Sequence, residues 1–538
     1  MFSIPKHKTN WVLASIVMVG AVLRLLWLDK YPAGFTPDEA AFGYNAYSIL
    51  QTGKDEWGTP WWKLPYTNLR SFGDYKLPLY SFLAIPSIKI FGLTEFAVRL
   101  PNAIFGILAI GAVYLLAKKL FNEGCGLSAA SLLAISPWHI SLSRGAFEAN
   151  LATFFLPLGL YLYLANKSFL SALVFSLGAY SYHSTRAITP LILALTFIFY
   201  KRINWKFILL FTIFSLPIIF SVFSKASSRV SDVGLFNPTD NWGGVADRRF
   251  EARNRGLPDA ISRLFSNKLI YTASTTFKNY ASYFSPQFLF TSGAGEATYG
   301  MIPGRGVLYY IEIPLLISFL LLLTKRPASQ TWFLLSLILV SALPAALSKG
   351  PGYPANRVAA LIPFLYIAIS LGLINLLENL RNYKKALTIF LLCAYSLSLI
   401  FFLEDYVYHA PSINPQSMTY GWRELAPRLK AIAQRFTDVR ISRSLSEPHI
   451  FVAFYSRLDP REYQKASAAW PRNVKFLDQY DGYFLGKYRF GDIYPKDSVT
   501  HPVLFVGKPD DFPPDYGEYF HIDYPNGQPA IQVAEKLP

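Results

Sequence analysis

Charged residues are scarce in this chain. Only 16% of its 538 residues are Asp, Glu, Lys or Arg, whereas 52% are hydrophobic and 16% are aromatic. Soluble domains carry about 25% charged residues. This deficit, together with a positive mean hydropathy, excludes an ordinary soluble protein and indicates an integral membrane protein.

Cysteine is nearly absent as well. The two cysteines, Cys125 and Cys393, lie in apolar runs and imply neither a disulfide framework nor a Cys-rich metal site. No motif has metal-ligand spacing, so the sequence indicates no definite cofactor and leaves a divalent metal possible. No internal repeat or low-complexity tract occurs. The net charge of +17 is spread over short loops rather than gathered in one stripe, so nucleic acid is not an expected partner.

Long apolar runs are abundant. A helix needs about 20 residues to span a bilayer. The first run is expected to be a retained span, because no small-residue cleavage site follows it. The chain is therefore predicted to be an α-helical polytopic membrane protein with about 11–13 transmembrane helices. The candidate spans lie at about 11–28, 77–93, 97–117, 124–142, 147–165, 168–183, 187–200, 206–223, 307–324, 331–348, 357–378 and 385–403.

Short basic loops predict the orientation of these spans. Lys201-Arg202, Lys325-Arg326 and Lys384-Lys385 are expected to face the cytoplasm. This puts the hydrophilic stretches 29–76, 224–306 and 404–538 on the extracytoplasmic side of the plasma (inner) membrane. Lys6 and Lys8 put the N-terminus inside. An inside start and an outside tail require an odd number of spans, and twelve are counted. One candidate is therefore wrong, split or re-entrant, and the basic pair at 118–119 and the short, Pro86-containing segment 77–93 are the expected places of the irregularity.

The chain divides into a transmembrane domain, 1–403, and a small α/β domain, 404–538. In the second domain we expect strands at Arg440–Ser442, Ile450–Tyr455 and Val503–Val506 and an amphipathic helix over Trp422–Phe436. Asn526-Gly527 is typical of a two-residue hairpin turn. The stretch 224–306 is too long for a simple connection and is expected to carry function or helices of its own.

An acidic pair, Asp38-Glu39, lies about ten residues beyond the first span. Thr36-Pro37 before it is typical of a helix start, where the helix dipole favours carboxylates. A solvated helix start is one interpretation of the pair. The other is catalytic, because transfer of a sugar to a hydroxyl needs a group that takes up the hydroxyl proton, and a carboxylate can do this.

Several cations border the apolar runs. Lys76 directly precedes the second span and follows a loop rich in Trp and Tyr, which is typical of a membrane interface. It is either a snorkelling lysine or a ligand for a lipid phosphate. Ionisable residues in or beside spans are costly and usually mark a site. Further candidates of this kind are Arg99, Arg144 with Glu148 four residues later, His183, Arg186 and Arg357.

The chain resembles the membrane glycosyltransferases of the GT-C fold. It looks specifically like the bacterial glycosyltransferase family 39 group, whose relatives include the protein O-mannosyltransferases and the lipid A aminoarabinose transferases. The likeness covers most of residues 1–403. It rests on four short motifs in order: Asp38-Glu39, Lys76-Leu-Pro78-Leu-Tyr, Arg99-Leu-Pro101-Asn, and Ser136-Pro137 followed by Arg144 and Glu148.

The resemblance implies inverting transfer of a sugar from a polyprenyl-phosphate carrier to a hydroxyl of a protein, lipid or glycan at the outer face. It also implies roles for residues. Asp38 would be the base, Glu39 would hold the acceptor or its neighbours, and Lys76 would lie near the carrier phosphate. Arg99 matches the family's Arg-x-Pro motif, whereas Glu148 stands where many relatives have aspartate.

Two other classes of function remain open at this stage. A transporter or flippase of a lipid-linked sugar would also carry buried ionisable groups, but it would place them near the midplane and often show repeat symmetry. An interaction or sensor protein with an inert membrane part would leave the ordered motifs from Asp38 to Glu148 unexplained.

Overall fold

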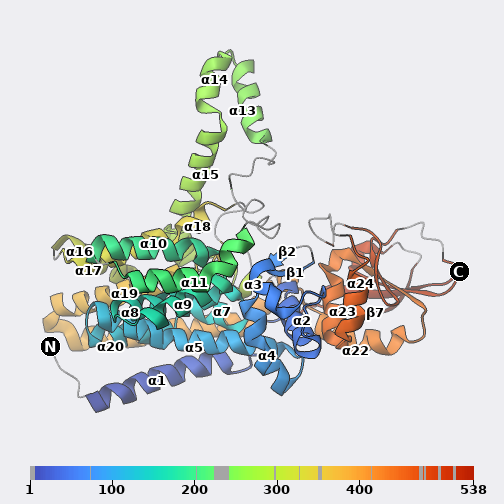
Figure 1. The fold of residues 1–538 in the computed structure, drawn as a ribbon, viewed down its shortest axis with the longest axis horizontal. Helices are drawn as coiled ribbons and strands as arrows, with labels where there is room; N and C mark the ends of the chain where they lie inside the picture. The colour runs from blue at the N-terminus through green and yellow to red at the C-terminus, as the bar shows by residue number, and fades with distance from the viewer. Residues whose placement is uncertain are drawn as a thin grey trace.

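The chain folds into a helical bundle joined end to end with a sheet domain, and the N-terminus lies at the end of the bundle away from that domain (Figure 1). The computed structural model describes residues 6–72, 74–201, 203–222, 235, 242–295, 298–325, 327–348, 354–413, 415–471, 477, 480–494, 499–512 and 516–538. Everything below concerns these residues.

A helix or a broken helix stands at each predicted apolar segment. By length and composition four helices are suited to cross a membrane, and a bent pair makes a possible fifth. Several shorter apolar helices accompany them, so the polytopic helical fold is confirmed and the number of spans stays a prediction. The bundle helices are α1 (Lys6–Leu25), α4 (Leu79–Phe91), α5 (Glu95–Leu120), α6 (Glu123–Ala134), α7 (Pro137–Arg144), α8 (Ala152–Leu164), α9 (Ser168–Ser181), α10 (His183–Tyr200), α11 (Trp205–Val222), α16 (Glu312–Lys325), α17 (Ser329–Ser341), α18 (Leu343–Ala346), α19 (Leu361–Asn379) and α20 (Lys384–Glu404).

The bent pair is α6 and α7, whose axes meet at 59°. Pro137 begins α7 and cannot continue the hydrogen-bonding of α6. The bend frees carbonyls at the end of α6, and the buried Arg24 of α1 binds two of them: its Nη1 lies 2.9 Å from the Ala134 oxygen and its Nη2 3.1 Å from that of Leu133. Arg24 therefore supplies donors that a helix end buried in apolar surroundings requires.

The first hydrophilic stretch is compact. It contains α2 (Pro37–Thr52), η1 (Trp61–Lys63), α3 (Leu64–Thr67) and the antiparallel pair β1 (Leu69–Ser71) and β2 (Asp74–Lys76). Helix α2 starts at Pro37 as predicted, and the structure adds a capping box: the Thr36 hydroxyl accepts the Glu39 N–H, and the Glu39 carboxylate accepts the Thr36 N–H. This capping box orients the adjacent side chain of Asp38.

The C-terminal domain contains a six-stranded sheet in the order β4-β5-β3-β6-β8-β7, in which β3 pairs in parallel with β5 and β6. Its strands are β3 (Asp438–Ser442), β4 (Tyr483–Leu485), β5 (Tyr488–Gly491), β6 (Val503–Gly507), β7 (Gly517–Asp523) and β8 (Pro529–Lys536). The predicted strands in β3 and β6 and the helix α22 (Trp422–Ala433) are confirmed. Asn526-Gly527 lies in a hairpin as predicted, but its turn is longer than two residues, because β7 ends at Asp523 and β8 begins at Pro529.

One prediction for this domain is wrong. The segment Ile450–Tyr455, expected to be a strand, belongs to helix α23 (Pro448–Ser456). Pro448 begins this helix, and most of the residues that follow are buried. Because a short, fully buried helix lacks a polar face, its periodicity does not distinguish it from a buried strand.

The C-terminal domain and the first hydrophilic stretch share one hydrophobic core. Helix α24 (Pro460–Ser467) binds the α2 region through Gln464, whose amide donates to the Thr52 hydroxyl and to the Asp55 carbonyl at 3.0 Å each. At the start of α5, Arg423 forms an ion pair with Glu95. The domain therefore holds the first stretch in place against the end of the bundle.

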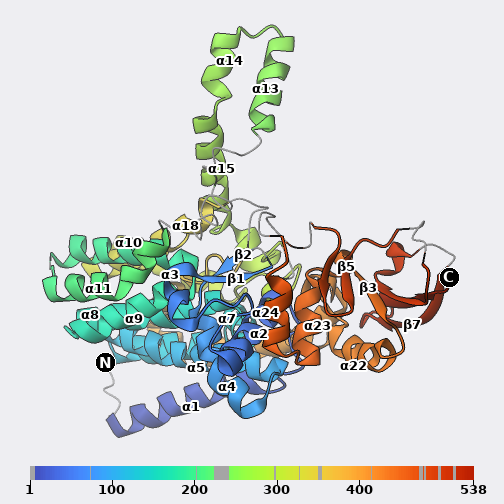
Figure 2. The ribbon, with the colours of Figure 1, turned by 45° about the vertical axis from the view of Figure 1, so that its right-hand side comes forward.

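The long hydrophilic stretch after α11 carries its own helices, as predicted. They are α13 (Gly243–Asn254), α14 (Asp259–Phe265) and α15 (Lys268–Ser282). Figures 1 and 2 show them leaving the bundle as an arm that runs at right angles to the long bundle helices in both views.

Candidate active site

Asp38 and Lys76 meet at the end of the bundle. Asp38 stands in the first turn of α2 and Lys76 ends β2, so the capped helix and the β1–β2 hairpin bring together side chains 38 positions apart. The Lys76 ammonium binds the Asp38 carboxylate. Lys76 is 2% exposed, with its Nζ 4.8 Å from the centre of the Phe72 ring, whereas Asp38 is 26% exposed. Asp38 is therefore the more exposed member of the pair.

Glu39 and Arg99 form a second pair that is fully buried. Arg99 Nε lies 2.9 Å from a Glu39 oxygen, and neither side chain has exposed surface. The same Glu39 oxygen accepts the Ala146 N–H at 3.0 Å, and Arg99 also donates to the carbonyl oxygens of Pro32 and Gly34. The structure therefore places both candidates where they tie the first stretch to α5 and to the residues after α7.

Arg144 and Glu148 lie on either side of Ala146. Arg144 is 5% exposed and donates to carbonyl oxygens at the end of α1, among them those of Leu23 at 2.7 Å and Leu26 at 2.8 Å. Its guanidinium thus satisfies acceptors of a helix terminus. Glu148 begins η2 (Glu148–Leu151) and is partly exposed.

The remaining predicted cations lie at two other places. His183 and Arg186 start α10, where Arg186 Nε donates to the Ala179 carbonyl at 3.0 Å. Arg357 lies before α19, and its Nη1 donates to the Ser348 hydroxyl at 2.8 Å, close to the base of the arm. All three side chains are partly exposed.

The sequence reasoning missed two carboxylates in the first stretch. Asp55 and Glu56 are both buried without exposed surface. Burial raises the pKa of Asp55 to about 6 and holds the pKa of Glu56 well above its ordinary value. Glu56 also lies close enough to Lys76 for their charges to interact. A second adjacent acidic pair in the same stretch as Asp38-Glu39 was the available signal.

The raised pKa of Glu56 predicts a pH-dependent stability. Unfolded Glu56 ionises above its ordinary pKa of 4.5, whereas the buried group keeps its proton to higher pH. The folded state then binds more protons, so stability is lost as pH rises toward the pKa of the folded protein. Glu56→Gln, a neutral mimic of the protonated acid, should raise the melting temperature by a few degrees near pH 8 and by less near pH 5.

Thermal unfolding of the purified chain in detergent at both pH values measures this difference. Glu462→Gln, on the exposed face of α24, is the matched control and should change the melting temperature equally at both pH values. An equal effect of Glu56→Gln at the two pH values would contradict the assignment of a protonated Glu56.

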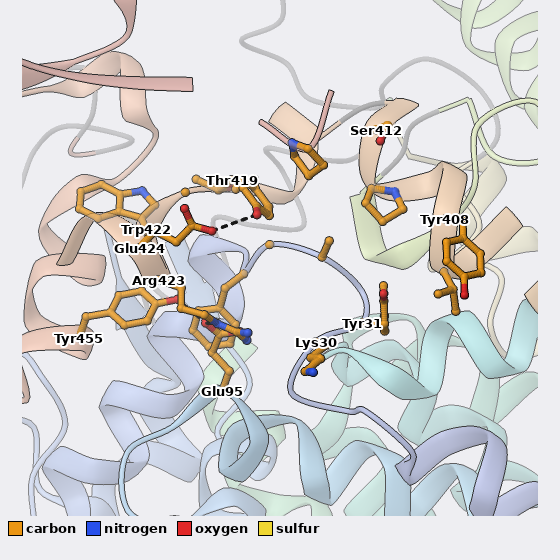
Figure 3. A pocket seen from close by; sticks show the side chains of 18 residues that line it. Lys30, Tyr31, Glu95, Tyr408, Ser412, Thr419, Trp422, Arg423, Glu424 and Tyr455 are labelled. Atoms are coloured by element: carbon orange, nitrogen blue, oxygen red, sulfur yellow. Dashed lines mark hydrogen bonds and ion pairs between the residues drawn. The ribbon is translucent and has the colours of Figure 1, made fainter. Parts of the chain in front are cut away.

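A cavity of about 450 Å³ opens where the bundle meets the C-terminal domain. Figure 3 shows Lys30 and Tyr31 on one side, Tyr408 and Ser412 on another, and Arg423 with Glu424 and Tyr455 from the C-terminal domain. Gly34 and Phe35, which directly precede the cap of α2, also line it. The cavity thus lies a few residues from Asp38 along the chain and combines aromatic rings, hydroxyls and charges.

Within the described residues, one group of side chains has donor atoms close enough to share a metal ion. It consists of Glu404, Asp405 and His409, whose ligand atoms lie within 4.8 Å of one another. Asp405 forms an ion pair with Arg305, and His409 Nε2 lies 2.9 Å from a Glu404 oxygen. Of the three, Asp405 is paired with a residue outside the group, Arg305, whereas Glu404 and His409 contact each other.

Residues 76–224 match the family described as "Dolichyl-phosphate-mannose-protein mannosyltransferase". This segment begins at Lys76 and includes the motifs at Arg99, Arg144 and Glu148. No curated protein matches the chain in sequence.

Solved structures show the fold over the whole chain. The ArnT protein of Cupriavidus metallidurans, bound to undecaprenyl phosphate, aligns with a TM-score of 0.57 at 12% identity over 98% of both chains. Its apo state aligns with a TM-score of 0.53 at 13% identity over the same shares. The oligosaccharyltransferase of Archaeoglobus fulgidus, tethered to an acceptor peptide, gives 0.50 at 16% identity over 84% of this chain. This chain spans 63% of that protein's length.

The alignments over nearly the whole chain show that it has the multi-pass GT-C fold of these structures, and the family match to residues 76–224 lies within its helical bundle. Its two parts, the helical bundle and the C-terminal sheet domain, both align with the ArnT protein, because that alignment covers nearly the whole of each chain.

Proposed function

We propose that the chain transfers a sugar from a polyprenyl-phosphate carrier to an acceptor hydroxyl, with inversion at the sugar carbon, on the extracytoplasmic face of the plasma membrane. The observation that carries the proposal is the pair formed by Asp38 and Lys76. It joins a partly exposed base and a cation suited to a phosphate in a stretch rich in interfacial aromatic residues. An undecaprenyl phosphate in the ArnT protein and a dolichol phosphate in the archaeal protein support a lipid-linked donor.

The reaction follows from the chemistry of these two groups. The acceptor oxygen attacks the anomeric carbon while the bond from that carbon to the carrier phosphate breaks. Asp38 takes the hydroxyl proton, which is general base catalysis. The Lys76 ammonium stabilises the negative charge that develops on the departing phosphate. When the donor phosphate binds Lys76, it replaces the Asp38 carboxylate there and leaves Asp38 available to the acceptor.

The other candidate residues support this pair. Glu39 and Arg99, fully buried, hold the cap of α2 and so position Asp38. Arg144 holds the end of α1, from which the first stretch starts. Glu148, His183, Arg186 and Arg357 are partly exposed, and we assign them to donor contacts.

The cavity in Figure 3 is proposed to receive the acceptor. Its walls come from the first stretch, from the helical segment that follows α20 (405–413) and from the C-terminal domain. A molecule bound there lies beside the residues that lead into α2. Tyrosine rings and hydroxyls suit a polar acceptor such as a peptide or a glycan. We place the cavity on the extracytoplasmic side because the short basic loops, such as the one at Lys384-Lys385, are expected to face the cytoplasm.

Donor binding tests the role of Lys76. Lys76→Met keeps most of the side-chain volume and removes the charge, and it should weaken binding of a polyprenyl-phosphate-linked sugar by about 10–100-fold, because a charged hydrogen bond contributes roughly 1.5–3 kcal/mol. Titration of the donor against purified protein in nanodiscs measures the dissociation constant. Lys89→Met, on an exposed position of α4, is the control and should bind as the wild type does.

Transfer itself is tested with the same preparation, donors of several sugars and a mixed pool of peptide, lipid and glycan acceptors. Release of carrier phosphate that depends on the acceptor supports a transferase. Movement of the donor between leaflets without any sugar transfer would instead identify a transporter and overturn the proposal.

A further inference from the structure

The arm formed by α13, α14 and α15 has its apolar residues on the outside. Within residues 242–283 the buried positions are small or polar apart from Val245 and Tyr283, with Ser262 1% and Thr272 6% exposed. Large apolar side chains point away from the arm instead, including Leu264 at 69% and Phe277 at 72% exposure. A helical hairpin that stands in water shows the reverse pattern. The outer face therefore requires an apolar environment.

The direction of the arm indicates which environment this is. The arm leaves the bundle at right angles to the long helix α5 in both ribbon views (Figures 1 and 2). Because α5 has the length and apolar composition of a membrane span, an arm at right angles to it runs parallel to the membrane plane. Helix α15 alone reaches about 22 Å at 1.5 Å per residue. An arm of this length and direction lies along a lipid surface rather than projecting into solvent.

The base of the arm is fixed to the membrane part of the bundle. Tyr280 donates to the Leu339 carbonyl of α17 at 2.9 Å, and Asn279 donates to the Ala346 carbonyl of α18 at 3.3 Å. A cavity of about 750 Å³ with mainly apolar walls runs between α15 and α18. It is lined by Phe277 of the arm and Leu343 of the bundle, so the apolar surface of α15 continues into that of a spanning helix.

The net charge of the arm indicates the charge of the lipid headgroups that it would contact. Residues 243–283 carry seven basic and three acidic side chains, a net charge of +4. At the start of α15, the end away from the bundle, Lys268 lies 4.8 Å above the Trp242 ring, a combination typical of the headgroup region. Arginine and lysine beside exposed Leu and Phe form the pattern of an interfacial helix that binds anionic lipid.

We propose that residues 243–283 form an interfacial arm that lies in the headgroup region of the bilayer and binds anionic phospholipid. Its apolar side chains enter the acyl-chain boundary, and its cations contact lipid phosphates. The proposal concerns membrane contact alone and holds whether or not the chain transfers sugar, so its test uses no activity measurement.

Spin labels on single cysteines in the full chain test the proposal. Cys393, which is exposed, is replaced by Ser, and Cys125, which is buried, is kept. Labels are placed at Leu264 and Phe277 of the arm and, as an aqueous reference, at Asn526 in the hairpin turn of the C-terminal domain. In nanodiscs of mixed anionic and zwitterionic phospholipid, collision rates with oxygen and with a water-soluble nickel chelate report the depth of each label.

The expected result is a several-fold higher ratio of oxygen to nickel collisions at the two arm positions than at Asn526. Nanodiscs of zwitterionic lipid alone should lower that ratio; an unchanged ratio would overturn the preference for anionic lipid. Equal ratios at all three positions would place the arm in water and overturn membrane binding. Labels shielded from both reagents would show that a protein, such as a second copy of this chain, covers the arm, and this too would overturn the proposal.

Discussion

Asp38→Asn is expected to reduce sugar transfer by about 10²–10⁴-fold, the usual contribution of a positioned general base. The amide keeps the size of the side chain and its place in the first turn of α2 but cannot take up a proton. The change should lower kcat and leave the donor dissociation constant within a few-fold of wild type, because Lys76 remains. Steady-state transfer and donor titration in nanodiscs separate these two quantities.

Two variants make the Asp38 result specific. Asp523→Asn alters a half-exposed carboxylate on β7, far from Asp38 in the chain, and should retain wild-type transfer. Asp38→Glu restores a carboxylate at the wrong distance and should recover part of the activity. Full transfer by Asp38→Asn would remove this residue from the mechanism and direct attention to Glu148, the other partly exposed carboxylate among the candidates.

Arg99→Met is expected to destabilise the protein by about 3–5 kcal/mol, because it leaves the Glu39 carboxylate buried without its charged partner. It also removes donors from the carbonyl oxygens of Pro32 and Gly34. The double variant Arg99→Met/Glu39→Gln should recover much of the loss, since no buried charge then remains unpaired. Thermal unfolding in detergent measures both.

The exposed pair of Lys118 and Glu123 provides the comparison. Lys118→Met removes an ion pair that water already screens, so the melting temperature should stay close to that of the wild type. A double variant no more stable than Arg99→Met alone would contradict the view that the unpaired charge is the cause.

The twelve apolar segments, the start of α2, two strands and the hairpin of the C-terminal domain all followed from the sequence. These features depend on local chemistry: hydrophobic runs, a Thr-Pro start, and an Asn-Gly turn. The bend between α6 and α7 did not follow, although Pro137 marks it. It falls inside the predicted span 124–142 and not at either of the two expected places of an irregular span.

For the candidate site, the sequence by itself determined which residue types lie beside the membrane and in what order. Only the tertiary structure shows which of these side chains are exposed, which are buried, and with which partner each one pairs. It paired Asp38 with Lys76 at a partly open position and enclosed Glu39 with Arg99 beside it. It also revealed the buried Glu56 near Lys76. Adjacent carboxylates in a sequence look alike, because exposure and partners are set by segments far away in the chain, here β2, α5 and the C-terminal domain.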